Sequence, residues 1–118
     1  MIGVPTFADA RRIALGLPET IEQPCWGTPA FYVRKRFFAR LLEDDERLVV
    51  KCSREERQAR AAERPEAFGW TAHYAKYEFV LVTLAVVKPA ELREILIEAW
   101  RMVAPKTLLR AYDATATT

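Results

Sequence analysis

Glycine and histidine are scarce in this chain, and their scarcity excludes several kinds of active site. The glycines are scattered and form neither a GxGxxG nor a GxxxxGK pattern, so no loop is expected to cradle a phosphate. The single histidine, His73, has no carboxylate or thiol at a familiar spacing, and with two isolated cysteines it cannot supply the four ligands of a structural zinc site. We therefore expect no nucleotide hydrolysis, no bound metal and no cofactor.

Cysteines and long apolar runs are also few. Cys25 and Cys52 lie far apart without a CxxC motif, which predicts free, buried thiols in a reducing compartment. The longest apolar run, residues 79–87, is far shorter than the ~20 residues that a membrane-spanning helix needs. Residues 1–7 lack the basic and apolar segments of a secretory signal. We expect a cytoplasmic protein without a membrane partner.

Charge is nearly balanced, with 18 Lys and Arg against 16 Asp and Glu and a formal net charge of +2. Any attraction for nucleic acid must therefore come from where the charges lie. The 118 residues are 51% hydrophobic and 29% charged, which is typical of a globular chain with one core. We expect a single domain over residues 1–118.

Periodicity and turn residues predict an α+β fold: a central antiparallel sheet of four to five strands with three main helices packed on one face. Thr6 with Asp9, Ser53 with Glu56, and Pro89 mark three helix starts. Extended segments are expected at 21–34, with a kink at Trp26-Gly27, and at 36–42, 47–52 and 78–85, while helices are expected at 6–17, after 53, from 89 and after 105. The last helix should end near residue 112, and the tail 113–118 should be frayed.

A hairpin around the acidic loop 43–46 places one set of side chains on the core face. Opposite Leu48, Val50 and Cys52 stand Leu41, Ala39 and Phe37. The other face then carries four cations interleaved with two apolar side chains, namely Arg36, Phe38, Arg40, Arg47, Val49 and Lys51. Such a face suits phosphate contact with nucleic acid, although the acidic tip would repel phosphate. The alternative is a solvated face whose charges prevent aggregation.

Aromatic residues offer a second kind of site. Trp70, His73, Tyr74 and Tyr77 share one loop, and Trp26 lies in another. Trp26, Trp70, His73 and Tyr74 could surround a pocket for a small ligand or a protein partner. The alternative is that these rings only attach the loops to the core. A third interpretation is an enzyme that uses Cys25 or His73, but nothing in the sequence brings the two together and we expect no catalysis.

Several segments, in their order, resemble the MmcQ/YjbR family. They are residues 25–31, 37–41, 48–51, 71–74, 99–101 and 104–106, and they span nearly the whole chain. The resemblance implies a fold similar to the frataxin-like CyaY arrangement and a DNA-binding role through a double wing of hairpins. Carried over to this sequence, it implies weak, non-specific phosphate contacts by Arg36, Arg40, Arg47 and Lys51. Trp26, Gly27 and Pro29 would shape the neighbouring turn.

Overall fold

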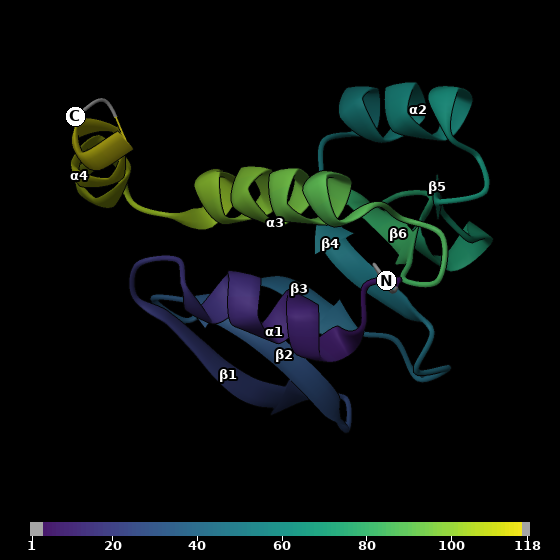
Figure 1. Cartoon of the computed structure of the whole chain (residues 1–118), viewed down its shortest axis with the longest axis horizontal. Coiled ribbons are helices and arrows are strands. Elements are labelled where there is room, and N and C mark those ends of the chain that lie inside the picture. The colour runs from purple at the N-terminus through teal and green to yellow at the C-terminus, as the bar shows by residue number, and fades with distance from the viewer. Residues whose placement is uncertain (1–3, 117–118) are drawn as a thin grey trace.

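The computed structural model describes residues 4–116 and folds them into a six-stranded antiparallel sheet with four α-helices (Figure 1). The strands lie in the order β1-β2-β3-β4-β6-β5. In chain order the elements are α1 (Phe7–Leu15), β1 (Thr20–Cys25), β2 (Thr28–Val33), β3 (Arg36–Leu41), β4 (Arg47–Lys51), α2 (Arg54–Glu63), β5 (Phe68–Gly69), a short 3-10 helix (Ala72–Tyr74), β6 (Phe79–Thr83), α3 (Pro89–Val103) and α4 (Lys106–Ala116). The α+β prediction is confirmed, with one strand more than the four to five expected and with the helix after 105 longer than expected.

The predicted helix starts are confirmed by their hydrogen bonds. The Thr6 N–H donates to Asp9 Oδ2 at 2.8 Å, and Ser53 Oγ accepts from the Glu56 N–H at 3.1 Å. Pro89 occupies the first turn of α3, where its missing N–H costs nothing. These local signals account for the boundaries of three helices.

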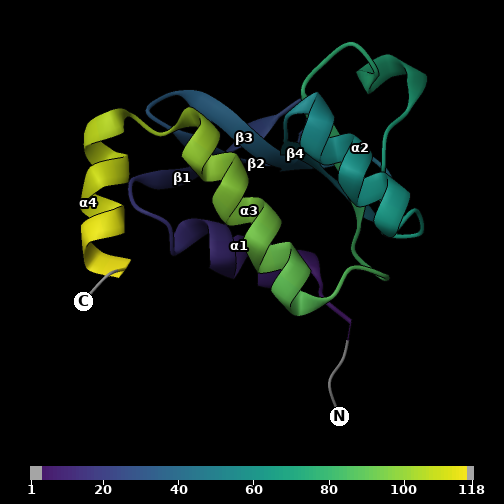
Figure 2. The same ribbon diagram turned by 90° about the horizontal axis from the view of Figure 1, so that it is seen from above.

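The helices pack on one face of the sheet, where the main core lies. Figure 2 shows α1 and α3 crossing that face with α2 beside them. Trp100 lies on the apolar stripe that three- and four-residue spacing predicts for α3, and it is completely buried in this core. Its indole N–H donates to the Pro18 carbonyl at 3.0 Å. The opposite face of the central strands is thereby left for the loops of the chain.

The predicted β3–β4 register is confirmed, because Leu41 pairs with Leu48 and Ala39 with Val50. The predicted sides of Phe37 and Phe38 are wrong. Against β2, Ala39 pairs with Phe31 and Phe37 with Tyr32, so β3 bulges at Phe38. A bulge interrupts the alternation of side chains. As a result Phe38 is fully buried in the core, and Phe37 turns to the face opposite the helices.

The C-terminal segment also differs from the prediction. Helix α4 continues to Ala116 instead of ending near Tyr112, and Asp113 accepts two hydrogen bonds from Arg101 of α3, the shorter at 2.7 Å. Residues 117 and 118 of the expected frayed tail lie outside the described residues. Over residues 4–116, no helix is long and apolar enough to cross a membrane.

Candidate ligand-binding pocket

A hollow of about 600 Å³ lies on the sheet face opposite the helices. Strand β3 contributes Phe37 and Arg40, strand β4 contributes Val49, and the β1–β2 hairpin and the segment 72–79 form the walls. The full lining is Cys25, Trp26, Phe37, Arg40, Glu43, Val49, His73, Tyr74, Tyr77 and Phe79. Six of these ten side chains are aromatic when His73 is counted, and Arg40 is the one cation among them.

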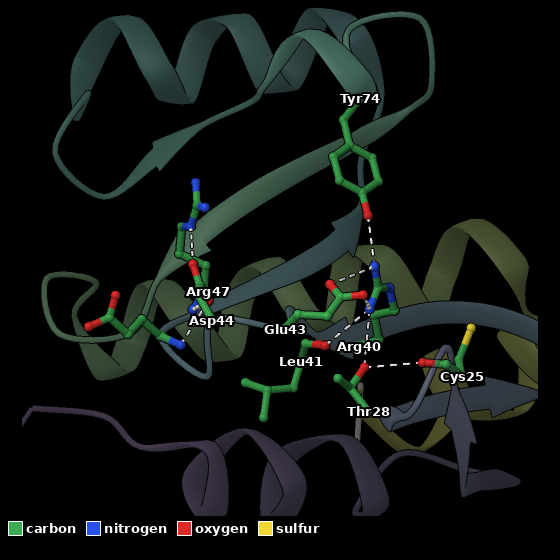
Figure 3. Close-up of polar contacts among 9 residues, drawn as sticks. Cys25, Thr28, Arg40, Leu41, Glu43, Asp44, Arg47 and Tyr74 are labelled. Carbon is green, nitrogen blue, oxygen red and sulfur yellow. Dashed lines mark hydrogen bonds and ion pairs between the residues drawn. The ribbon is translucent and has the colours of Figure 1, made fainter.

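The Arg40 guanidinium is almost completely buried, with 6% of the residue exposed. Figure 3 shows it held between three chain segments: Nη2 donates to the Tyr74 hydroxyl at 2.9 Å, and Nη1 donates to Thr28 Oγ1 at 3.1 Å and to the Leu41 carbonyl at 3.3 Å. Its carboxylate partner is Glu43, which accepts from both terminal nitrogens at 3.4 Å. Burial lowers the pKa of Arg40, but the hydrogen bonds to Tyr74 and Glu43 outweigh that effect and raise it above its ordinary value. Arg40 is therefore a permanent cation inside the pocket.

Arg57 of α2 shapes the wall of the pocket from behind. This residue is 5% exposed, and its guanidinium donates to the carbonyls of Tyr74, Ala75, Tyr77 and Phe79 at distances of 2.9 to 3.1 Å. Trp70 lies over the same guanidinium, 4.4 Å from ring centroid to Cζ. Arg57 thus gathers the segment that carries His73, Tyr74 and Tyr77. Sequence reasoning missed it; the available signal was an arginine on the inward side of a short helix that is otherwise highly charged.

The aromatic walls pack against one another. The Phe37 and Phe79 ring centroids are 5.5 Å apart, and Tyr74 meets Phe79 edge-on at 6.1 Å. His73 meets Tyr74 edge-on at 4.8 Å and lies tilted against Tyr77 at 6.1 Å. Edge-to-face and tilted pairs at these separations are the favourable arrangements of aromatic rings. The walls are thus preformed apolar surfaces.

Trp26 stands at the rim of the pocket, at the tip of the β1–β2 hairpin. Trp26 and Gly27 both have positive φ, at 55° and 81°, as a tight two-residue hairpin turn requires. The left-handed region is unfavourable for a bulky residue such as tryptophan, and this indole is 82% exposed. Packing in the free protein therefore does not explain why this position carries a tryptophan.

The four predicted phosphate-binding residues do not form one exposed basic face. Arg40 is buried in the pocket, and Arg47 is paired with Asp44 of the acidic loop at 2.7 Å. Arg36 donates to the Val103 carbonyl at the end of α3, on the helix side, and the Lys51 ammonium lies 5.1 Å from the Phe79 ring centroid. The prediction that these four cations share one face is wrong, because the bulge turns β3 and the acidic loop folds back onto two of them.

The predicted aromatic pocket residues fare better. Trp26, His73 and Tyr74 all line the hollow, whereas Trp70 lies outside its lining and stacks on Arg57. The structure therefore brings three of the four together. Tyr77, which shares the loop of His73 and Tyr74, also lines the hollow, and the structure adds Phe37 and Phe79, which the sequence did not single out.

Both cysteines are free, as expected, but they are not equally buried. Cys52 is buried in the core, and burial raises the pKa of its thiol to about 11. Cys25 is half-buried at the pocket, so its expected full burial is wrong. The pKa of Tyr32 is raised mainly by partial burial and, to a smaller extent, by a hydrogen bond with Cys25. Within residues 4–116 no cluster of three or more His, Cys, Asp or Glu side chains could hold a metal ion.

This arrangement defines an α+β domain with helices on one face of the sheet and a ligand-sized aromatic pocket on the other. The chain belongs to the YjbR family, whose profile matches residues 15–102. It is 32% identical to the uncharacterised proteins Rv2570 of Mycobacterium tuberculosis (strain H37Rv) and Mb2600 of Mycobacterium bovis, with 92% of this chain and 96% of each relative covered.

A solved structure shares the same fold. The crystal structure of Deinococcus radiodurans protein DR2400, with a DUF419 domain, superposes with a TM-score of 0.74 at 26% identity. The match covers 88% of this chain and 82% of the other. The fold predicted from the family resemblance is therefore confirmed.

Proposed function

We propose that this protein is a non-catalytic binding module that holds a small planar molecule in its aromatic pocket. The observation that carries the proposal is the hollow of about 600 Å³ built around the buried Arg40. Binding sites for small molecules have volumes of roughly 300 to 1,000 Å³, with mostly apolar walls and a few polar groups that orient the ligand. The pocket meets each of these criteria.

The groups that could perform chemistry in this pocket support binding over catalysis. His73 packs between the rings of Tyr74 and Tyr77, and Cys25 interacts with Tyr32. A nucleophile needs an adjacent base that a third group orients. The half-buried thiol and the ring-packed imidazole instead serve as parts of the wall.

DNA, the partner implied by the family resemblance, is the competing proposal. It draws support from Arg36 and Lys51, which have no carboxylate partner among the ion pairs of residues 4–116. Against it, Arg40 and Arg47 are neutralised by the acidic loop, so the charge available to phosphate is halved. The two free thiols fit a protein of the reducing cytoplasm under either proposal.

Chemical-shift mapping tests the pocket directly. The uncharged dye phenylnaphthylamine, titrated into the isotope-labelled protein, should perturb the backbone amides of residues 25–26, 37, 49 and 72–79. Tyr77→Ala should weaken this binding about tenfold, because it removes one aromatic wall. Leu15→Ala is the matched control, since Leu15 is 43% exposed against 44% for Tyr77 but lies on α1.

Two results would contradict the proposal. One is the absence of any shift at millimolar dye; the other is perturbation confined to another part of the surface, such as the hollow of about 520 Å³ between α1 and α3.

A further inference from the structure

The ion pair between Arg40 and Glu43 is unusually loose for an arginine that is nearly buried. Both of its contacts are 3.4 Å long, and the Glu43 side chain is 59% exposed. The solvent-exposed pairs of the same protein are tighter: Arg11–Glu22, Arg47–Asp44 and Arg101–Asp113 each close to 2.7 Å. Charge-assisted contacts of this kind normally measure about 2.7 to 2.9 Å.

Burial alone disfavours the charge of the Arg40 guanidinium, and Glu43 is the carboxylate that balances that charge. Removing a charge from water carries a large penalty, which a close, well-formed ion pair offsets. The neutral partners, Thr28 Oγ1 and the Tyr74 hydroxyl, orient the guanidinium but do not balance its charge. Glu43 reaches it from the hairpin loop and spans both terminal nitrogens, which is where a two-oxygen anion would bind (Figure 3).

The surroundings of this position favour a flat, apolar ligand body. Phe37 and Phe79 pack together, and His73 contacts Tyr77; all four side chains line the pocket together with Arg40. Trp26 is exposed at the rim in a strained turn, so its indole is free to cover an occupant. Aromatic walls on several sides with one cation at the end match an aromatic ring that carries an anionic group.

We propose that the pocket binds aromatic carboxylates or sulfonates, and that Glu43 occupies the anion position in the free protein and leaves when such a ligand binds to Arg40. This inference rests on the proposed ligand-binding function and names the chemical class of the ligand. Released Glu43 returns to the solvated loop with Asp44, Asp45 and Glu46, where it is hydrated. Ligand and Glu43 compete for one guanidinium.

Two dyes with the same rings distinguish the contribution of the anionic group to binding from that of the aromatic rings. Anilinonaphthalene sulfonate carries a sulfonate that phenylnaphthylamine lacks, and both can be titrated by fluorescence. The sulfonate dye should bind the parent protein about tenfold more tightly than the neutral dye, because it gains a charge-assisted contact with Arg40. Displacement of one dye by the other should show that they share a site.

Substitution of Glu43 tests the competition without disturbing the core. Glu43→Gln should tighten binding of the sulfonate dye up to about fivefold relative to the neutral dye, because it removes the competing carboxylate. The expected gain is modest because ion pairs with an exposed partner are weak. Glu46→Gln is the matched control: it removes the same charge from the same loop without a contact to Arg40, and it should change neither affinity.

Arg40→Lys, checked for folding by its melting curve, should bind the sulfonate dye about tenfold more weakly, since lysine cannot make the two-pronged contact. Equal affinity for both dyes, together with no response to Glu43→Gln, would overturn the anion proposal and leave the pocket in place. Failure of both dyes to bind at residues 72–79 would overturn the pocket as well.

Discussion

Trp26 combines two properties that rarely occur together, a positive φ and an almost fully exposed indole. The left-handed conformation costs a non-glycine residue roughly 1 to 2 kcal/mol. Among non-glycine residues, asparagine is one that adopts it more readily. Neighbouring Gly27, at φ 81°, occupies a similar conformation at no steric cost. Position 26 therefore carries a residue that is unfavourable for the fold and favourable for contact with a ligand.

Trp26→Asn should raise the free energy of unfolding by about 1 kcal/mol and weaken binding of the neutral dye severalfold. Urea unfolding and dye titration of the same preparation measure the two effects. Gly27→Ala, the control for the turn, should lower the free energy of unfolding by about 1 kcal/mol because alanine is strained at its φ. Loss of stability in Trp26→Asn would contradict the view that Trp26 is kept for binding.

The two thiols should differ in reactivity because only one of them is deeply buried. With the pKa of Cys52 raised to about 11, alkylation at pH 8 should modify Cys25 alone, and both thiols should react after unfolding. Because the pKa of Cys52 is raised in the folded state, burial of its protonated thiol contributes fully to stability below pH 9. This contribution is lost as the pH rises toward 11. Mass spectrometry of the folded protein measures the first effect. Modification of Cys52 as fast as Cys25 would contradict its burial.

At the scale of elements, the pocket depends on a helix that does not line it. Arg57 of α2 holds three carbonyls of the segment between β5 and β6 and the carbonyl of Phe79 at the start of β6, and Arg54 adds a further contact to the Lys76 carbonyl. The described part of this segment contains only one short helical turn, so its shape depends on these contacts. Helix α2 therefore positions three aromatic walls of the pocket.

Arg57→Gln should lower the free energy of unfolding by about 1.5 to 3 kcal/mol, because hydrogen bonds from a charged donor to buried carbonyls are lost. Hydrogen exchange should speed up in the amides of residues 72–79 more than in those of β3 and β4, and dye binding should weaken. Arg93→Gln, at an exposed arginine of α3, serves as the control and should leave all three measurements unchanged. Uniform acceleration of exchange across the sheet would indicate that Arg57 supports the whole core instead of this segment.

At the scale of the whole molecule, near-neutral charge limits any interaction with DNA. Of the four cations on and beside the hairpin, Arg40 and Arg47 are paired with carboxylates of its loop. About two charges therefore remain for phosphate, and the slope of log affinity against log salt should be no steeper than about −2. Affinity at physiological salt should be weaker than micromolar, with no preference for sequence.

Fluorescence anisotropy on random duplex DNA measures this slope. Lys51→Ala should make the slope of log affinity against log salt shallower. Arg40→Lys should leave this slope unchanged because Arg40 is buried. A slope near −4, or submicromolar binding that Arg40→Lys weakens, would favour DNA over the small ligand.

Local patterns in the sequence predicted the main helices, most of the strands and the pairing of β3 with β4. Helix starts at Thr6, Ser53 and Pro89 depend on residues within one turn, and the β3–β4 register depends on a short loop, so local patterns were sufficient. The place of Trp100 in the core followed from helical periodicity. The family resemblance then placed these elements in the right overall fold.

The pocket depends on contacts between segments that lie far apart in the chain. The bulge at Phe38 arises from the pairing of β3 with β2, and it reverses two side chains that simple alternation had assigned to the other faces. Arg40 becomes a buried cation because Tyr74, 34 residues away, and Thr28 close over it. Arg57 reaches carbonyls 17 to 22 residues further along the chain. Such contacts join segments that share no local pattern, so a single sequence could name aromatic candidates but could not assemble the pocket.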